Sequence, residues 1–510
     1  MTTTSPPGSA GLPDPAALPV PGAPLAPGDL PVPDATTVPR DALPLTVLQF
    51  GAGNFLRAFV DQMIQGANDA GVTRHGVAVV HATPGPDRAL DLLREQDGIY
   101  HVLLEGVRAG EPVRQVTRVT AIQRVVRAHE EFAAYRATYL EPSLRVLVSN
   151  TTEAGIAWVE GDDLTATPPA SFPAKVTALL LDRFRHFGGD PAAGLHVVCC
   201  ELIEDNASTL RRYVLAHAAA NDLPDAFVAW VEQACTFHDT LVDRIVPGYP
   251  RDGIDDVHRQ IGYADRLVVK GELYGVWAVG GDPALREVLP LDRAGQPVEF
   301  LPDVRPYRDR KVRVLNGMHT ALSPLGLLLG EDGVRETVAR ADVARYLDLL
   351  LDREVMPSLA EDPEALRRFA ATIRERFTNP FLHHRLADIA LNALAKYRSR
   401  NLPVLLEAWQ DGREAPATAF ALAALLVLDS GRLGPAGFEP ADDPGPLALA
   451  RACDDGDLAG WVRGVVVAAG MLPADDPRLA RLADEVAGHA GSILRRGAEA
   501  ALADLLADAG

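Results

Sequence analysis

The chain has little cysteine and no long apolar run, and these absences exclude several classes of protein. Four of its 510 residues are cysteine, and no two of them form a CxxC pair. A disulfide framework or a thiolate zinc site is therefore not expected. No run of about 18 apolar residues occurs, and the N-terminus lacks a basic segment followed by a continuous apolar one. The sequence thus predicts a cytoplasmic protein that is neither exported nor inserted in a membrane.

Basic residues are also scarce. The chain has 49 Lys and Arg against 69 Asp and Glu, which gives a formal net charge of -20. Such a charge repels nucleic acid and anionic membrane surfaces, so neither is an expected partner. An anionic small molecule would need a local basic pocket. With 47% hydrophobic residues, a chain of this length can bury a large core, and we expect two domains.

The first 303 residues divide into a leader and an α/β domain. Residues 1–44 are dense in Pro, Ala and Gly, which predicts a disordered leader. From residue 45 to 303, predicted strands alternate with predicted helices. This order predicts a parallel, doubly wound sheet and a Rossmann-like dinucleotide-binding domain. The strands are expected at 46–50, 77–80, 116–122, 145–148 and 196–200, and helices at 55–70, 175–187 and 210–220.

Residues 304–510 have a different character, because their apolar residues recur at helical spacing almost throughout. We expect here a mainly α-helical domain that carries substrate and catalytic residues. Its predicted helices include 343–351, 366–377, 389–397, 417–428 and 479–506.

A glycine turn follows the first predicted strand. In a dinucleotide fold one glycine makes the tight turn and a second lets the backbone approach the pyrophosphate. Gly51 and Gly53 stand at these positions, although Leu56 replaces the third glycine of the usual motif. An ordinary strand-to-helix turn is the alternative. The context after a strand and before a helix favours a nicotinamide cofactor, for which we expect NAD.

The sequence indicates the choice between NAD and NADP less clearly. NAD enzymes usually carry an acidic residue at the end of the second strand, whereas this chain has His81 there. Asp87 could reach the ribose, or Arg88 could accept a 2′-phosphate. Both could equally be solvated charges of a loop.

Lys311, Asn316 and His319 form the most informative group. On an α-helix they fall within an arc of about 140°, so they can face one cleft. Carbonyl reduction needs a proton donor, for which Lys311 is suited, and a hydrogen-bond donor for the developing oxyanion, for which Asn316 is suited. His319 would hold a substrate hydroxyl or orient Lys311. A basic helix start with a core histidine is the alternative interpretation.

Alcohol oxidation requires a neutral lysine. We therefore expect the pKa of Lys311 to be lowered by desolvation or by the neighbouring Arg310 and Arg313. Tyr307 and Lys311 also match the YxxxK of short-chain dehydrogenases. Those enzymes are about half this length and begin with a TGxxxGxG loop, which this chain lacks.

The Lys-x4-Asn-x2-His pattern resembles the signature of the mannitol dehydrogenase family, the polyol-specific long-chain dehydrogenases. The resemblance extends almost end to end from Val47 and includes residues 50–59, 149–156 and 240–250. It implies a Rossmann-like N-terminal domain, an α-helical C-terminal domain and a metal-free active site between them. The expected cofactor contacts are Phe50, Gly51, Gly53, Asn54, Phe55, Asn150 and Thr151.

Residues 200–204, 310–320 and 377–380 resemble most closely a branch of the family that reduces the sugar acid tagaturonate. The implied reaction converts D-tagaturonate and NADH to D-altronate and NAD. Fructuronate, mannitol or another polyol could replace this substrate. A sugar-acid epimerase that keeps a bound nicotinamide is a further alternative.

Two positions depart from the family pattern or are ambiguous. Mannitol-oxidising members have an asparagine oxyanion partner in a Cys-Asp-Asn stretch, where this chain has Cys200-Glu201-Leu202. That role is then empty or passes to Asn206. Asp243 matches a family acidic residue near the catalytic lysine, but an ion pair with Arg244 is an equal alternative.

A uronate carboxylate needs a cation, preferably an arginine that can bind both oxygens. Lys396 resembles a substrate-contacting position of the family, and Arg385 is a second candidate. His383 and His384 are adjacent and no carboxylate lies at helical ligand spacing from them, so a metal site is not expected. The sequence is compatible with a monomer or a homodimer.

Overall fold

The computed structural model describes residues 43–152, 154–381 and 384–508. The predicted leader, except for its last two residues, lies outside this range. The described chain forms two compact units. The first contains residues up to 105 together with 113–304, and the second contains residues 106–112 together with everything from 305 onward.

A six-stranded parallel sheet forms the centre of the first unit. Its order is β5-β2-β1-β6-β7-β8, and every neighbouring pair is parallel. Numbered along the chain, this is the order 3-2-1-4-5-6 of dinucleotide-binding folds. The predicted doubly wound sheet is confirmed. Its strands are β5 (Ile122–Arg127), β2 (Gly76–His81), β1 (Leu45–Phe50), β6 (Val146–Ser149), β7 (His196–Cys199) and β8 (Thr236–His238).

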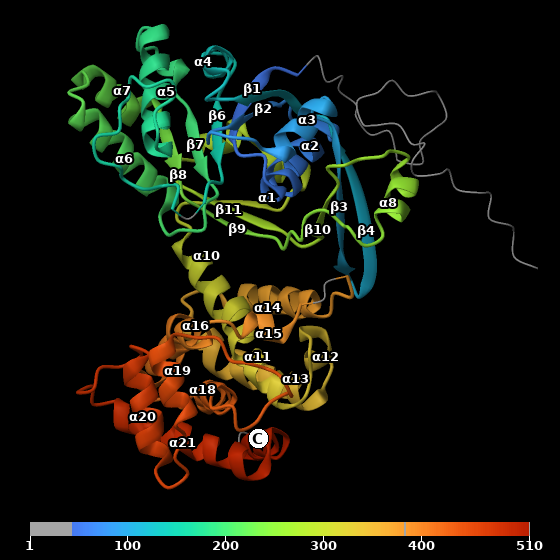
Figure 1. Cartoon of the computed structure of the whole chain (residues 1–510), viewed down its shortest axis with the longest axis vertical. Coiled ribbons are helices and arrows are strands. Elements are labelled where there is room, and N and C mark those ends of the chain that lie inside the picture. Colours follow the sequence, from blue (N-terminus) through green and yellow to red (C-terminus); the bar gives the residue numbers. More distant parts are fainter. Residues whose placement is uncertain (1–42, 153, 382–383, 509–510) are drawn as a thin grey trace, which may run out of the picture. The chain divides into compact units, whose positions relative to one another are not determined.

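Side chains of the sheet enter two hydrophobic cores alternately. Val47 belongs to one core and Leu48 to the other, because successive residues of a strand point to opposite faces. Both faces are covered by helices, as Figure 1 shows, which explains why these strands read as continuous apolar runs. One face carries α1 (Asn54–Ala58), α2 (Val60–Asp69) and α3 (Arg88–Glu95); the other carries α4 (Phe132–Tyr139), α5 (Phe172–His186), α6 (Asn206–Ala220) and α7 (Asp225–Ala234).

Two predicted elements of this unit were wrong in detail. The helix expected at 55–70 breaks at Phe59, whose φ of -127° and ψ of -78° are not helical. The strand expected at 116–122 is the end of β4 (Glu111–Val119) and the start of β5. Between them the backbone N–H of Thr120 donates to Oε1 of Gln65 at 2.8 Å. A side chain of α2 thus accepts the hydrogen bond that the carbonyl of a neighbouring strand would accept in a continuous strand.

Smaller elements complete the first unit. One three-stranded sheet has the order β10 (Val269–Glu272), β3 (Tyr100–Arg108), β4, and another has the order β12 (Val298–Leu301), β11 (Val276–Gly280), β9 (Thr240–Asp243). The short helices are Pro191–Ala193, α8 (Ile254–Ile261), α9 (Ala284–Val288) and Leu291–Ala294. The turn between β3 and β4 clusters with the second unit, where Gly110 donates its N–H to Glu375 Oε1 at 2.9 Å.

The second unit is helical apart from its connections and the β3–β4 turn, as predicted. Its helix α18 is buried on all sides and packs against α11 and α21. The elements are α10 (Arg305–Arg310), a π-helix (Lys311–Asn316), α11 (Gly317–Leu328), α12 (Val334–Val338), α13 (Ala341–Leu349), a second π-helix (Leu350–Val355), a short 3-10 turn (Met356–Ser358), α14 (Pro363–Phe377), α15 (Leu386–Ile389), α16 (Ala393–Arg400), α17 (Leu402–Gln410), α18 (Pro416–Asp429), α19 (Pro444–Arg451), α20 (Leu458–Ala468), α21 (Leu479–Arg496) and α22 (Ala498–Asp508).

Two long predicted helices are each divided. The segment 389–397 is interrupted at Asn392, which has a φ of +54° and precedes α16. The segment 479–506 is interrupted at Gly497, with a φ of +84°. Helical apolar spacing continues across both breaks, so periodicity did not reveal them. Within the described ranges, no helix combines the length and the apolarity needed to span a membrane.

Candidate active site

The glycine turn after β1 uses its two glycines differently. Gly51 has a φ of +114°, which side-chain-bearing residues rarely adopt, and its N–H donates to Val80 O at 3.0 Å. Gly53 has an ordinary φ of -63°, and a Cβ added there would meet no atom within 4 Å. Gly51 is therefore required by the backbone, whereas Gly53 leaves open space beside the start of α1.

This turn lies where the strand order of the sheet reverses. The strands β2 and β5, which follow β1 in the chain, are added on one side of it, and β7 and β8, which follow β6, are added on the other side of the sheet. At this boundary Phe50 of β1 is paired with Ser149 of β6. The N–H of Asn150 donates to Phe50 O at 3.4 Å. Asn150 and Thr151 thus lie beside Phe50 and Gly51 at the carboxyl edge of the sheet. Dinucleotides bind at this kind of switch point in open α/β sheets.

Glu201 holds the β6 side of the switch point, a role that the sequence did not reveal. Its side chain is 2% exposed and accepts hydrogen bonds from the Thr151 N–H and Oγ1, both at 2.9 Å, and from Ser149 Oγ at 3.1 Å. The amide of Asn150 donates to Cys200 O at 2.6 Å. Glu201, which stands where the chain departs from the Cys-Asp-Asn stretch of the family, therefore fixes the turn that follows β6.

Arg57 holds the β1 side from beneath. It donates to Ala52 O at 3.1 Å, to Leu267 O at 2.6 Å and to Asn54 Oδ1 at 2.6 Å. Burial lowers the pKa of Arg57. Asn54 also lies close to Gly248, where a Cβ would come within 2.5 Å of Asn54 Nδ2. The Asn54 side chain is thus held in place by neighbours on two sides.

The remaining candidate cofactor residues have structural contacts of their own. Phe55 stacks on Phe59, with ring centroids 4.8 Å apart. In the loop after β2, Asp87 caps α3 by accepting from the Ala89 and Leu90 N–H groups at 2.8 and 3.2 Å. Its second oxygen lies 3.7 Å from His81 Nε2, and Arg88 is exposed. Asp87 is therefore committed to its helix and to His81.

The hypothesis that Asn206 takes an oxyanion role was wrong. Its Nδ2 donates to Glu201 O at 3.0 Å and to Thr240 O at 3.2 Å. Its Oδ1 accepts from the N–H groups of Ala207 at 2.9 Å and Thr240 at 3.1 Å. Both amide N–H groups and the oxygen are used, so this buried side chain joins β7 to β9 and has no donor left for a substrate.

Asp243 ends β9 and is 8% exposed. The next residue, Arg244, donates to Ala58 O at 2.6 Å, to Gln62 Oε1 at 3.1 Å and to Tyr274 O at 3.2 Å. Burial lowers the pKa of Arg244 to about 10. Arg244 thus ties β9 to the helices after the glycine turn, which is a different role from the ion pair with Asp243 that the sequence allowed.

The candidate catalytic residues of the second unit lie on and directly after a π-helix. Lys311 and Asn316 are its first and last residues, and the N–H of the following Gly317 donates to Val312 O, five residues earlier, and to Val314 O. Short π segments inside α-helices often mark functional sites. The expected α-helical arc was wrong, because hydrogen bonds from residue i to i+5 widen this turn. Asn316 consequently lies more nearly above Lys311 than in an α-helix.

His319 is buried one turn further on. Its ring lies 4.5 Å from that of Phe377 and 4.9 Å from that of His384, between centroids. Burial, assisted by the charges of His384, Arg376, Arg400 and Lys396, holds the pKa of His319 well below its usual value. Nε2 is buried and has no hydrogen-bond partner among the described residues. His319 is therefore a neutral imidazole with one nitrogen uncommitted.

The two arginines beside Lys311 are already paired. Arg310 binds Glu361 through Nη1 at 2.9 Å and lies over the ring of Tyr307. Arg313 binds both oxygens of Glu407, one of them at 2.8 Å. A carboxylate therefore accompanies each of the two guanidinium charges beside Lys311.

Of the predicted substrate cations, the structure places Lys396 near His319, where its charge affects the histidine. Lys396 Nζ donates to Ile389 O at 2.9 Å. Arg385 is exposed and lies 3.8 Å from Asp332. Arg400, which sequence analysis missed, donates through Nη1 to Thr320 Oγ1 at 3.0 Å. Its spacing of four residues from Lys396 was the available signal.

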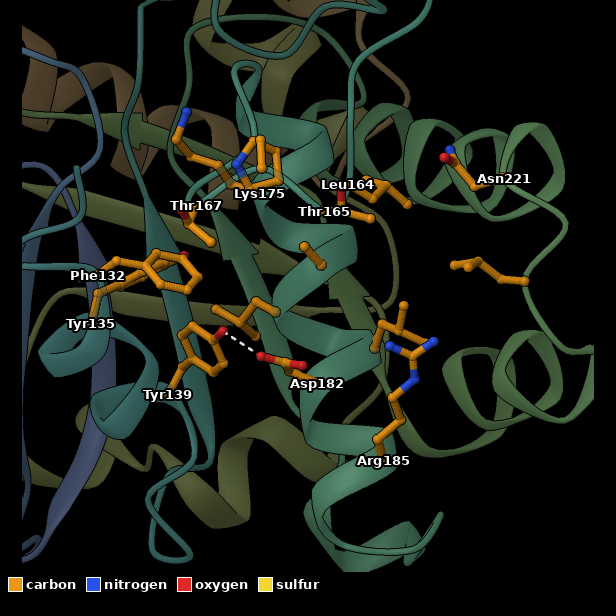
Figure 2. Close-up of a pocket in the computed structure, with 16 residues that line it drawn as sticks. Phe132, Tyr135, Tyr139, Leu164, Thr165, Thr167, Lys175, Asp182, Arg185 and Asn221 are labelled. Atoms are coloured by element: carbon orange, nitrogen blue, oxygen red, sulfur yellow. Dashed lines mark hydrogen bonds between the residues drawn. The ribbon is translucent and has the colours of Figure 1, made fainter.

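A separate cavity of about 370 Å³ lies in the first unit between α4, α5 and the segment 164–169. Figure 2 shows Tyr139 directed at Asp182 across it, with an O–O distance of 2.7 Å. None of the predicted site residues lines this cavity. Among the residues that the structure covers, no group of three His, Cys, Asp or Glu side chains could hold a metal ion; His383 lies outside them.

Comparison with known proteins identifies the family. Residues 45–292 match the mannitol dehydrogenase Rossmann domain, and residues 303–436 match the mannitol dehydrogenase C-terminal domain. The chain belongs to the mannitol dehydrogenase family. It is 38% identical over 465 residues to an altronate oxidoreductase of Bacillus subtilis (strain 168). The aligned region covers 90% of this chain and 95% of that protein.

Further similar proteins agree with membership of the mannitol dehydrogenase family. An altronate oxidoreductase of Yersinia pestis is 37% identical over 473 residues, 91% of this chain and 98% of the relative. A D-sorbitol dehydrogenase structure has a TM-score of 0.78 at 23% identity, covering 92% of this chain and 96% of that one. Pseudomonas fluorescens mannitol 2-dehydrogenase, solved with NAD and D-mannitol, has a TM-score of 0.65 at 23% identity with the same coverage. The chain is therefore a dehydrogenase that acts on CH–OH groups with a nicotinamide cofactor.

Proposed function

We propose that this protein is an NAD-dependent oxidoreductase that interconverts D-tagaturonate and D-altronate, with Lys311 as general acid and base. The observation that carries the proposal is the buried His319, whose pKa the charges of Arg376, Arg400 and Lys396 help to lower, on the helical stretch that also bears Lys311 and Asn316. Positive side chains beside a neutral imidazole are suited to bind a sugar that carries a carboxylate. The similarity to altronate oxidoreductases over nine tenths of the chain supports the same substrate.

In this proposal each of the three residues has one task. Lys311 gives a proton to the ketone oxygen during reduction and takes it back during oxidation. Asn316 donates from its amide to the oxygen as negative charge develops. His319 uses its uncommitted Nε2 to bind a substrate hydroxyl. Asp243, Lys396 and Arg385 remain the proposed substrate contacts from the sequence.

NAD would supply or accept the hydride. The residues proposed to hold it are those of the switch point: Phe50, Gly51, Gly53, Asn54, Phe55, Asn150 and Thr151. The geometry fits a dinucleotide, since Gly53 opens onto free space at the edge where the strand order reverses. We also propose that no metal is needed, because the Lys311 ammonium and the Asn316 amide provide the charge stabilisation that a Lewis acid would give.

The test is NADH oxidation by the purified protein with tagaturonate, fructuronate and fructose, together with NAD reduction by mannonate, repeated with the NADP cofactors and with a chelator. Turnover of tagaturonate with NADH that resists the chelator supports the proposal. Preferred turnover of fructuronate or fructose would instead assign one of the related substrates. Conversion of a sugar acid without a stoichiometric change in NADH would indicate an epimerase.

A further inference from the structure

Helix α16 carries two cations on one face. Lys396 and Arg400 are four residues apart, so their side chains are neighbours, and like charges in this arrangement destabilise a helix. Both are partly buried. Desolvation lowers the pKa of Lys396, and the charge of Arg400 lowers it further. Desolvation also lowers the pKa of Arg400. Both side chains donate hydrogen bonds to neutral oxygens, since Lys396 Nζ donates to Ile389 O and Arg400 Nη1 donates to Thr320 Oγ1.

Neither cation has a carboxylate partner in the described part of the chain. The guanidinium of Arg400 binds the neutral hydroxyl of Thr320, and no acidic side chain forms an ion pair with it there. Asp442 acts on Lys396 from a distance, but its two oxygens accept the N–H groups of Leu394 and Asp443, at 2.7 and 2.8 Å. Arg313, by comparison, is bound to Glu407 through both oxygens.

Arg400 is connected to the catalytic turn. Thr320 is 2% exposed and follows His319 directly. Its hydroxyl accepts from Arg400 Nη1 at 3.0 Å and donates to Asn316 O at 2.9 Å. Arg400 is thus fixed in orientation on the turn that bears Asn316, while its remaining N–H groups keep the capacity to bind both oxygens of a carboxylate.

We propose that Arg400, with Lys396 beside it, binds the carboxylate of the sugar-acid substrate and is the residue that distinguishes sugar acids from neutral sugars. A half-buried arginine without an acid is costly, and a substrate carboxylate would offset this cost. The inference rests on the proposed function, since it assigns the acidic end of that substrate.

The experiment compares two ligands that differ at one carbon. Altronate and altritol have the same hydroxyl configuration, but altritol has CH2OH in place of the carboxylate. Their dissociation constants are measured by calorimetry with the wild-type protein in the presence of NADH and with Arg400→Met. We expect Arg400→Met to weaken altronate binding roughly 10²-fold and to leave altritol binding unchanged, because a buried charge pair loses one partner.

Arg398→Met is the matched control. Arg398 lies on the same helix but is bonded to Ala469 O, and its loss should change neither constant. Arg400→Lys should recover part of the altronate affinity, since it keeps the charge without the fork of donors. Equal weakening of altronate and altritol in Arg400→Met would reduce Arg400 to a structural role, and unchanged altronate binding would overturn the inference outright.

Failure of the proposed function is distinguishable from failure of this inference. If the wild-type protein does not turn over tagaturonate, the titration is repeated with gluconate against sorbitol and galactonate against galactitol. A preference for the acids that disappears in Arg400→Met would retain the inference for another sugar acid. Absence of any preference in the wild-type protein would remove it.

Discussion

The backbone N–H of Gly317 donates to the carbonyl oxygens of Val312 and Val314, five and three residues earlier, where an α-helix would use that of Arg313. The extra residue in this turn changes the direction of every side chain before it relative to every side chain after it. Lys311 precedes the bond and His319 follows it, so the relative orientation of the two residues is set here. The structure thus places the proposed proton donor and the neutral imidazole on one helix with a spacing that an α-helix would not give.

Replacing Lys311 by Ala should lower kcat roughly 10²- to 10⁴-fold, the usual contribution of a general acid or base. Steady-state rates of NADH oxidation check this, and a small primary amine in the buffer should restore part of the rate. Arg374→Ala is a suitable control, because Arg374 pairs with Asp348 at the surface. A rate near that of the wild type would remove Lys311 from the mechanism.

Asn316→Ala should reduce kcat on the order of 10²- to 10³-fold with a smaller change in KM, because an oxyanion donor acts mainly in the transition state. The bond from Thr320 uses the backbone oxygen of Asn316 and is retained in this variant. The melting temperature should therefore stay close to that of the wild type. An increase in KM with unchanged kcat would assign Asn316 to ground-state binding.

The two glycines of the first turn predict opposite phenotypes. Gly51→Ala forces a Cβ into a φ of +114° and should destabilise the protein by about 1–3 kcal/mol. Gly53→Ala should fold normally, since its φ is ordinary, but should weaken NADH binding because the new methyl enters the space left for the cofactor. Thermal melting and NADH fluorescence titration measure the two effects. A normal NADH affinity in Gly53→Ala would place the cofactor elsewhere.

Sequence was sufficient for the parallel sheet and for its glycine turn. Val47 and Leu48 both face a core, and this gives the continuous apolar runs that predict a doubly wound sheet. The break at Phe59 was not predictable, since apolar spacing continues through it. The role of Glu201 also required the fold, because its partners Ser149 and Thr151 come from another strand.

Stability should depend on pH through Asp61. Burial raises the pKa of Asp61 to about 7, although Gln49 and Tyr100 donate hydrogen bonds to it. Between about pH 4 and pH 7 the native state keeps a proton that the unfolded state releases, so the free energy of unfolding falls as pH rises. The stabilisation that the protonated Asp61 carboxyl gives the native state is fully present below about pH 4. It is lost, by up to about 4 kcal/mol of the free energy of unfolding, as pH rises through 7.

Asp61→Asn keeps an oxygen acceptor without the ionisation. Its melting temperature should match that of the wild type below about pH 4 and exceed it by several degrees at pH 8. Other titrating groups cancel in the comparison of the two proteins. A difference that does not vary with pH would show that the carboxyl of Asp61 is not the group responsible.

The candidate site of the second unit was predictable in its motif but not in its surroundings. The spacing predicted one helical stretch that carries Lys311, Asn316 and His319, and these residues lie on two consecutive helical segments. Arg310 and Arg313 pair with Glu361 and Glu407, which lie 51 and 94 residues further along the chain, so these partners could not be read from the sequence. Arg400 was missed because the proposal for it depends on the absence of an ion pair among the described residues, and a sequence does not show which arginines lack a carboxylate partner.

The turn between β3 and β4 has a consequence for dividing this protein into parts. Residues 106–112 cluster with the helical unit, where Gly110 binds Glu375, although the strands on both sides lie in the first unit. A cut between Val304 and Arg305 would leave the helical fragment without that turn and the first fragment with an unsupported loop. Separate expression of the two halves would therefore require a graft: residues 106–112 supplied to the helical half and a short linker in their place in the other.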